Sequence, residues 1–268
     1  MNPDAPTVDR EGWRLIVAAD APSAEALIAE VLAIVSGKAG CRQIRRSRHA
    51  TTFRLDALAG DADSCLFVKV LDPPWGLERL KHRLRGTRSN RLAQITESLT
   101  AAGYSVPQLM LHGIESGTGR EVVVTARVAG EGPLLTLKRI GGSLDTKRAV
   151  LRSLGAEIGR LHSTGLIHGD LTPFNVCIAL GEPPRFAFID NERTRRSFGV
   201  DVERQRLRNL VQLGHFTLPG ITLTDRLRVF RAYEAALDRR RSRRLVRRAA
   251  RMLRRRMRRD AMVSPGLS

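Results

Sequence analysis

Short apolar stretches separated by polar turns dominate the first part of the chain. Residues 13–18 predict a strand, and apolar positions at helical spacing in residues 24–35 predict a helix. Residues 41–46, 52–58 and 65–70 then predict three consecutive strands. Strands that follow one another through short turns pair antiparallel, so we expect an antiparallel sheet in this region.

One more helix and two more strands follow. Residues 77–102 are compatible with a long helix whose first half is strongly basic. Residues 107–112 and 121–128 predict two strands, and the glycine-containing stretch 129–132 indicates a hinge. Residues 1–11 show no periodic pattern, and we expect them to be disordered.

The second half of the chain has helical periodicity. Residues 146–163 carry apolar side chains at helical spacing, and residues 201–238 predict further helices. Between them, residues 176–180 and 186–189 predict a hairpin, and residues 239–259 predict a last, arginine-rich helix. The order of elements predicts an α+β fold, with an antiparallel sheet before a mostly helical region.

The charge of the chain is unusual, whereas its apolar content is ordinary. Apolar residues make up 42% of the 268 residues, but the net charge is +19. Residues 239–259 alone hold thirteen arginines and no acid. A segment of this kind indicates an anionic partner, such as a membrane surface, a nucleic acid or a phosphorylated glycan.

The cysteines and the N-terminal region indicate the compartment. Cys41, Cys65 and Cys177 show no spacing typical of a metal site or a disulfide framework, which favours a reducing cytosol. Acidic residues precede the first apolar run, so we expect no secretory signal. Residues 24–35 are too few and too charged to span a bilayer. We expect a soluble or peripheral cytosolic protein.

One polar stretch carries the chemistry. Residues 168–175 read His-Gly-Asp-Leu-Thr-Pro-Phe-Asn, and a later apolar run ends at Asp190. Protein kinases have a loop of the form H-x-D-L-x-x-x-N, followed by a hairpin and a metal-binding Asp. In this interpretation Asp170 is the catalytic base, while Asn175 and Asp190 hold Mg²⁺ on the phosphates of ATP. An ordinary loop with an Asx turn is the alternative, but the loop, the hairpin and Asp190 together disfavour it.

Lys69 is the candidate for a phosphate-binding lysine. It ends an apolar strand, and burying an unpaired ammonium group is costly, so a phosphate or an acidic partner is expected beside it. A lysine that points to solvent from an edge strand is the alternative. Glu97 is the natural acidic partner on the predicted helix, with Gln94 as another option and Glu78 too near in sequence.

The turn between the predicted strands 41–46 and 52–58 is the next candidate for phosphate binding. A protein kinase has a glycine-rich loop there, which covers the phosphates of ATP. This chain has Ser47 and Arg48 instead, which could contact the phosphates together with backbone amides. A solvated, basic hairpin tip fits the same residues equally well.

Two positions in the loop argue against a regulated protein kinase. Gly169 stands where such kinases have an arginine, and Thr172 stands where they have a lysine. No Ala-Pro-Glu follows Asp190. These differences favour a kinase that acts on a small molecule or a glycan.

At this level of detail the chain resembles the lipopolysaccharide core kinases, which phosphorylate heptose or 3-deoxy-D-manno-octulosonic acid (Kdo) in the inner core. The resemblance runs from about residue 41 to residue 238. The matching segments are 67–70 (FVKV), 77–81 (LERLK), 101–107 (AAGYSVP), 168–171 (HGDL), 188–190 (FID) and 207–210 (LRNL).

The resemblance implies a bilobal protein-kinase-like fold that uses ATP and Mg²⁺. It assigns ATP binding to Lys69, the role of base to Asp170, and metal binding to Asn175 and Asp190. It also implies a glutamate near position 92, where this chain has Leu92. The lysine–glutamate pair typical of kinases is therefore left open.

The resemblance divides the chain into four parts. Residues 1–40 are expected to be an N-terminal extension of strand and helix, and residues 41–131 a kinase-like N-lobe with its hinge. Residues 132–238 are expected to form the C-lobe with the catalytic loop. Residues 239–268 are expected to be an arginine-rich amphipathic tail.

Two basic regions fit an anionic acceptor. The first comprises Arg79, Lys81, Arg83, Arg85, Arg88 and Arg91, which could bind carboxylates or phosphates of a core sugar or could be a solvated face. In the tail, Val246, Ala250, Leu253 and Met257 form one apolar stripe among arginines. Such a helix can lie on an anionic membrane. RNA is the competing partner, although the tail has no aromatic residue for base stacking.

The leading hypothesis is an ATP-dependent kinase that phosphorylates a heptose or Kdo hydroxyl at the cytoplasmic face of the inner membrane. A small RNA-associated serine/threonine protein kinase or ATPase is the second hypothesis. The third is a kinase-like pseudoenzyme that serves as a scaffold, which Leu92 and the missing glycine-rich loop suggest.

Overall fold

The computed structural model describes residues 6–21, 23–38, 41–47, 49–56, 65–73, 86–199, 201–216, 218–237 and 243–263. The chain forms two compact units, Met1–Val128 and Ala129–Ser268, which are described in turn.

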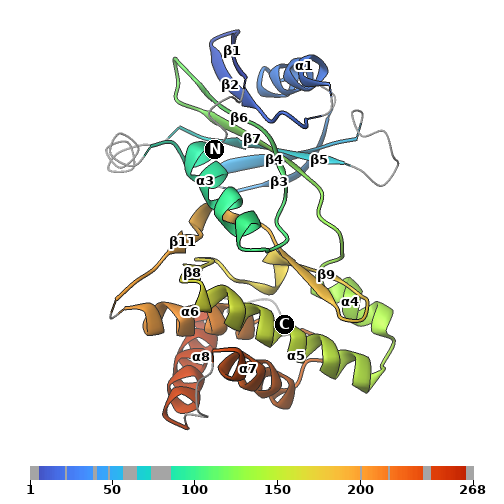
Figure 1. Cartoon of the computed structure of the whole chain (residues 1–268), viewed down its shortest axis with the longest axis vertical. Coiled ribbons are helices and arrows are strands. Elements are labelled where there is room, and N and C mark those ends of the chain that lie inside the picture. The colour runs from blue at the N-terminus through green and yellow to red at the C-terminus, as the bar shows by residue number, and fades with distance from the viewer. Residues whose placement is uncertain are drawn as a thin grey trace. The chain divides into compact units, whose positions relative to one another are not determined.

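The first unit is built on a sheet of seven antiparallel strands (Figure 1), in the order β1-β2-β6-β7-β5-β4-β3. The three strands predicted after the first helix form the meander β3-β4-β5. The strands are β1 (Thr7–Arg10), β2 (Trp13–Val17), β3 (Arg42–Arg46), β4 (Ala50–Leu55), β5 (Leu66–Leu71), β6 (Leu109–Glu115) and β7 (Glu121–Ala126).

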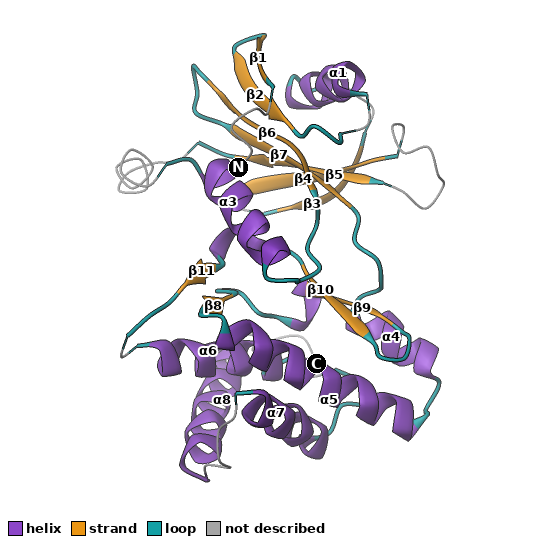
Figure 2. Ribbon diagram, in the orientation of Figure 1, coloured by secondary structure: helices purple, strands orange, loops and turns teal. Residues whose placement is uncertain are grey.

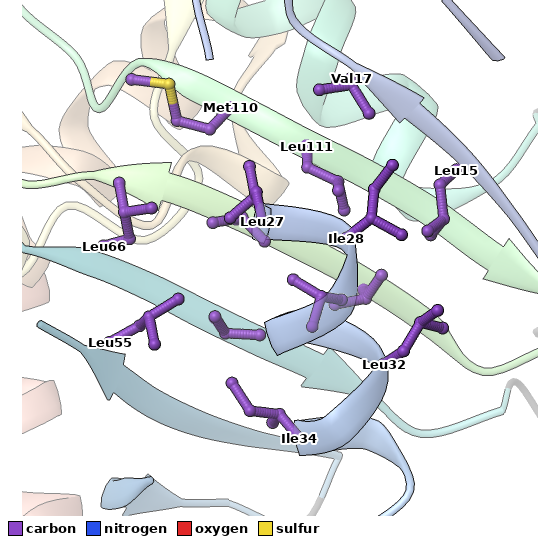
Figure 3. Packing of buried hydrophobic residues seen from close by; sticks show 14 of the residues in the cluster. Leu15, Val17, Leu27, Ile28, Leu32, Ile34, Leu55, Leu66, Met110 and Leu111 are labelled. Carbon is purple, nitrogen blue, oxygen red and sulfur yellow. The ribbon is translucent and has the colours of Figure 1, made fainter. Parts of the chain in front are cut away.

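Two helices, α1 (Ala24–Val35) and α3 (Arg88–Ala101), cover opposite faces of this sheet. Successive side chains of a strand point to opposite faces. Accordingly, Val122 and Val124 pack in a cluster with Leu27 of α1, whereas Val123 packs in another cluster with Leu92 of α3. Figure 3 shows the α1 side, where the helix lies on the sheet through its buried leucines and isoleucines.

The prediction of disorder for residues 1–11 is wrong over Thr7–Arg10. This segment is strand β1, which pairs with β2, and β2 pairs in turn with β6. Strands β1 and β2 of the N-terminal segment 1–40 therefore belong to this sheet, and α1 packs on one of its faces. A short, mostly exposed edge strand needs no apolar alternation, so the sequence pattern did not reveal it.

The second unit is mainly helical, with two small two-stranded sheets (Figure 2). The predicted α+β arrangement, an antiparallel sheet followed by a helical region, is confirmed. The elements of this unit are α4 (Pro133–Ile140), α5 (Leu144–Ser163), β8 (Leu166–Ile167), η1 (Pro173–Asn175), β9 (Val176–Ala179), β10 (Arg185–Phe188), η2 (Asn191–Arg193), β11 (Arg195–Arg196), α6 (Val202–Gly214), α7 (Leu223–Ala236) and α8 (Arg243–Val263).

Helices α5 and α7 pack very closely because α5 carries two glycines one turn apart. A Cβ atom at Gly155 would lie 2.2 Å from the carbonyl oxygen of Val229. A Cβ atom at Gly159 would lie 2.6 Å from the Cβ of Ala236. Because interiors are already close-packed, larger residues at these positions would push α7 away. Among the described helices, none is both long enough and apolar enough to cross a membrane.

Candidate active site

His168 is a fully buried hydrogen-bonding residue at the start of the candidate loop. Its Nδ1 accepts a hydrogen bond from the backbone N–H of Asp170 at 3.4 Å, so Nε2 carries the proton that it donates to the carbonyl oxygen of Ile189 at 3.0 Å. Burial lowers the pKa of His168 against the opposing effects of the bond to Ile189 and of the charge of Asp190. The neutral ring thus ties the loop to the end of β10.

Asn175 is locked to the same loop. Its side-chain nitrogen donates to the backbone oxygen of Asp170 at 2.8 Å, and its backbone N–H donates to the oxygen of Thr172 at 3.1 Å. Its own backbone oxygen accepts from Ile189 at 3.0 Å. With the amide nitrogen committed to Asp170, the remaining side-chain oxygen is the atom that Asn175 can offer to a cation.

Asp190 has a left-handed backbone, with φ 61° and ψ 46°, directly before η2. A non-glycine residue in this region is uncommon and is held by its surroundings. Asn191 donates to the oxygen of Phe188 at 2.7 Å, and the hydroxyl of Thr194 donates to the oxygen of His168 at 3.2 Å. Asn191 and Thr194, which follow Asp190, therefore fix this turn against the loop.

Gly169 cannot be replaced by a residue with a side chain without a shift of the backbone. Its φ is +75°, and a Cβ atom would lie 2.3 Å from the carbonyl oxygen of Arg193. The absence of an arginine at this position follows from the close approach of the turn after Asp190.

Asn209 of α6 connects two buried histidines. Its side-chain oxygen accepts from Nε2 of His162 at 3.1 Å and from the backbone N–H of His168 at 3.2 Å. The other ring nitrogen of His162 accepts from the hydroxyl of Tyr233 at 3.0 Å. Burial lowers the pKa of His162 to about 4. This histidine is therefore neutral near pH 7 and acts as a fixed link between α5, α6 and α7.

Gln212 extends this connection to the candidate base. Its side-chain oxygen accepts from Asn209 at 3.2 Å. Its nitrogen donates to the backbone oxygen of Gly169 at 3.4 Å and to Oδ1 of Asp170 at 3.5 Å. A continuous chain of hydrogen bonds thus runs from Tyr233 to Asp170 within the second unit.

Sequence reasoning did not single out Gln212, and it used Asn209 only as part of the family resemblance. The spacing of these two residues in the sequence could have identified them. Residues three apart lie on the same face of a helix, so Asn209 and Gln212 form a polar patch beside the buried Leu207 and Val211. A buried amide such as that of Asn209 indicates a hydrogen-bond partner elsewhere in the fold.

In the first unit, Lys69 is half-buried on β5, opposite Thr52 on one neighbouring strand and Val123 on the other. It lies on the same sheet face as Leu71, two residues further along, and therefore on the face that α3 covers. The alternative of an edge-strand lysine is excluded, because β5 is paired on both sides.

The expected glutamate of α3 is replaced by a core residue. Glu97 and Gln94 both lie on the exposed surface of α3, and pairing of Glu97 with Lys69 stays a prediction. Glu78 lies outside the described residues. Leu92 is 8% exposed and packs with Ala50, Leu71 and Val123.

Glu121 is a buried acid that sequence reasoning missed. It is 0% exposed, and its carboxylate accepts from the backbone N–H of Ser89 at 2.7 Å and from Nε of Arg88 at 3.0 Å. A carboxylate at the positive end of a helix is favourable, so Glu121 anchors the first turn of α3 to the sheet. The sequence could have pointed to Glu121, because it is an acid at the start of an otherwise apolar strand.

Ser47 closes the turn between β3 and β4. Its hydroxyl and its backbone N–H donate to the oxygen of Ala50 at 3.1 and 2.8 Å. Contact between Ser47 and phosphate stays a prediction, and Arg48 lies outside the described residues.

Of the first basic region, Arg79, Lys81, Arg83 and Arg85 also lie outside the described residues. Arg88 is bound to Glu121, and Arg91 donates to the oxygen of Gly86 at 2.7 Å. These two arginines thus hold the start of α3.

Helix α8 confirms the predicted arginine-rich helix but corrects the expected role of its apolar stripe. Val246, Ala250 and Leu253 line an apolar cavity of about 350 Å³ together with residues of α5, α6 and α7. The stripe therefore faces the other helices of the unit, and contact of α8 with a membrane stays a prediction. The side chain of Met257 lies outside the description. The exposed residues of α8 include Arg247, Arg248, Arg251, Arg254 and Arg255.

The chain matches parts of known proteins. The chain is 34% identical to the EKC/KEOPS complex subunit BUD32 of Encephalitozoon cuniculi over 37% of this chain and 45% of that protein. It is 25% identical to a probable bifunctional tRNA threonylcarbamoyladenosine biosynthesis protein of Methanothermobacter thermautotrophicus over 65% of this chain and 30% of that protein. It thus spans less than half the length of these relatives.

Among solved structures, the bifunctional kinase-methyltransferase WbdD matches with a TM-score of 0.45 and 17% identity, over 92% of this chain and 53% of that chain.

A family model, in contrast, matches a continuous part of the chain that contains the whole site described above for the second unit. The match covers residues 75–233, more than half of the chain, and includes the loop 168–175, Asp190, Asn209 and Gln212. The chain therefore belongs to the lipopolysaccharide kinase (Kdo/WaaP) family.

Proposed function

We propose that the chain transfers the γ-phosphoryl group of ATP to a sugar hydroxyl, of heptose or Kdo, in the inner core of lipopolysaccharide. The family supports a kinase with a sugar acceptor. The observation that carries the proposal is the 2.8 Å hydrogen bond from the side chain of Asn175 to the backbone of Asp170. It holds a candidate base and a candidate metal ligand at the two ends of one turn, as phosphoryl transfer requires.

In this proposal Asp170 accepts the proton of the acceptor hydroxyl. The hydroxyl oxygen forms a bond to the γ-phosphorus while the bond from that phosphorus to the oxygen of ADP breaks. Asn175 and Asp190 would hold Mg²⁺, which neutralises charge on the phosphates. Their amide and carboxylate oxygens suit this cation, which takes one or two carboxylates and completes its shell with phosphate and water. Lys69 would bind the phosphates, as the family resemblance implies.

Transfer of labelled phosphate tests the proposal. The full chain is incubated with γ-labelled ATP, Mg²⁺ and a core oligosaccharide that contains heptose and Kdo. We expect labelled oligosaccharide from the native chain and none from the Asp170→Ala variant. No transfer to any heptose- or Kdo-containing acceptor would contradict the proposal.

A second candidate is an RNA-associated serine/threonine kinase or ATPase. It is favoured by similarity to the BUD32 subunit and to the tRNA threonylcarbamoyladenosine biosynthesis protein, although each match is partial. Tight binding of tRNA, together with label on serine or threonine of the chain itself, would favour it. If the Asp170→Ala variant retained full biological function, the scaffold hypothesis would replace both.

We further propose that α8 holds the protein on the anionic cytoplasmic face of the inner membrane. Because its apolar stripe is packed inward, this contact would be electrostatic and would not require insertion. Each basic residue near an anionic surface contributes about 1 kcal/mol, and salt screens the attraction. Binding to vesicles with anionic lipid should therefore disappear at high salt. Salt-resistant binding, or binding to neutral vesicles, would contradict this mode.

A further inference from the structure

We propose that Phe174 and Phe216 form a platform on which the ring of the acceptor sugar stacks beside Asp170. This inference rests on the proposed function and adds a specificity-determining residue to it. In the candidate catalytic loop, one apolar side chain is turned outward between two buried neighbours.

Phe174 is that side chain. It is 54% exposed, whereas Pro173 and Asn175 on either side of it are buried. At this exposure the ring loses about half of the free energy that its full burial would provide. Among the described phenylalanines, Phe198 is also exposed, at 75%, but only Phe174 lies within the candidate loop 168–175.

The ring of Phe174 is held in a defined orientation. It meets the ring of Phe216, which follows the C-terminus of α6, edge to face, with centroids 5.1 Å apart and planes at 83°. Phe216 is itself packed against the ring of His215, with centroids 3.9 Å apart. Edge-to-face pairs are stabilising, so the exposed ring is positioned before any ligand arrives.

The place of Phe174 in the turn next to Asp170 indicates a sugar ring as the ligand. An acceptor hydroxyl must come within hydrogen-bond reach of Asp170, and a sugar ring that lies over the adjacent turn meets this condition. Phe174 belongs to that turn, between Asp170 and Asn175. A pyranose ring has one face made of C–H groups, which packs on an aromatic ring while its hydroxyls stay directed to the base. This chemistry fits heptose and Kdo equally.

The exposed ring of the platform, Phe174, is separate from the apolar cavity of the unit. Pro173 and Phe216 line that cavity, whereas Phe174 does not. Truncation of Phe174 should therefore leave the interior packing in place. Leu144, which is 56% exposed at the start of α5 and does not line the cavity either, offers a matched control.

Kinetics of three substitutions test the platform. We expect Phe174→Ala to raise KM for the core oligosaccharide about three- to tenfold, the range of one aromatic contact, with KM for ATP unchanged. Phe174→Trp should keep the native KM, and Phe174→Leu should behave like Phe174→Ala because it lacks the ring. Leu144→Ala should match the native chain. An unchanged KM in Phe174→Ala would overturn the platform while leaving the proposed function intact.

Binding without turnover separates the two proposals. Saturation-transfer NMR with the same oligosaccharide should show contact to ring C–H protons in the native chain and a loss of that contact in Phe174→Ala. This result would support the platform even if no phosphate is transferred. Absence of sugar binding to the native chain would overturn it. If Phe174→Ala lost binding to a short RNA but kept binding to the sugar, the sugar platform would also be overturned. That result would favour a role of Phe174 in base stacking.

Discussion

The carbonyl oxygen of Arg193 occupies the space that a side chain at Gly169 would need. The distance from that oxygen to a Cβ atom at position 169 is 2.3 Å. This contact joins the two halves of the candidate site, because Gly169 precedes Asp170 and Arg193 lies in the turn that follows Asp190.

Gly169→Ala should therefore displace the loop. A left-handed residue with a Cβ costs about 1–2 kcal/mol, and the clash with Arg193 adds to this cost. We expect a lower melting temperature and at least about tenfold lower phosphotransfer, since a small displacement of the base is sufficient for such a loss. Gly199 has φ +81° with nothing within 4 Å of a Cβ, so Gly199→Ala measures the backbone cost alone. Equal effects of the two substitutions would show that the contact with Arg193 is unimportant.

Gln212 is expected to act as a positioning residue for Asp170. Gln212→Ala removes the hydrogen bond to Oδ1 of Asp170 and should lower kcat about tenfold with little change in KM. Gln212→Glu keeps the shape but places a second carboxylate beside Asp170, so we expect it to be the more damaging variant. A purely structural role predicts the reverse order. Gln205→Ala on the same helix, where the side chain bonds Arg195, is the control.

Acidification should destabilise the second unit through His162. Its pKa is lowered from 6.5 to about 4 in the folded chain, so the unfolded chain binds more protons between these values. The contribution of His162 to stability is therefore fully present above pH 6.5. It is lost as the pH drops towards 4, which lowers the free energy of unfolding by about 3 kcal/mol. His168, whose pKa is also lowered, adds to the loss in the same direction.

Urea unfolding at pH 4.5 and pH 7.5 measures this dependence. The difference in the free energy of unfolding between pH 4.5 and pH 7.5 should be smaller in His162→Gln than in the native chain, even if that variant is less stable overall. Gln205→Ala, which removes no titratable group, should keep the native difference. An undiminished difference in His162→Gln would contradict the assignment.

Glu121 should control the order of α3. Glu121→Gln weakens acceptance from Ser89 and Arg88, and the loss of a buried charged acceptor costs about 1–3 kcal/mol. Hydrogen exchange of the first turn of α3 should accelerate, while exchange of β7 changes less. Glu25→Gln, which removes an exposed pair with Arg10, should have little effect on either. Unaltered exchange in α3 would show that the anchor is dispensable.

The local spacing of apolar and turn residues was sufficient to predict many elements of this protein. The meander β3-β4-β5, helix α5 and the hairpin β9-β10 follow apolar periodicity and turn residues, which act over a few positions. The grouping of Asp170, Asn175 and Asp190 as one candidate site was also visible, because the loop and the hairpin that connect these residues are short. Their roles in catalysis and metal binding stay predictions.

Tertiary structure decided the features that depend on contacts between distant segments. Asn209 and Gln212 reach the loop only because α6 packs beside it, and the stripe of α8 faces inward only because the interior of the unit accepts it. Strand β1 exists only because β2 offers a free edge. Periodicity determines which residues can share a face, whereas the packing of whole elements determines what that face meets.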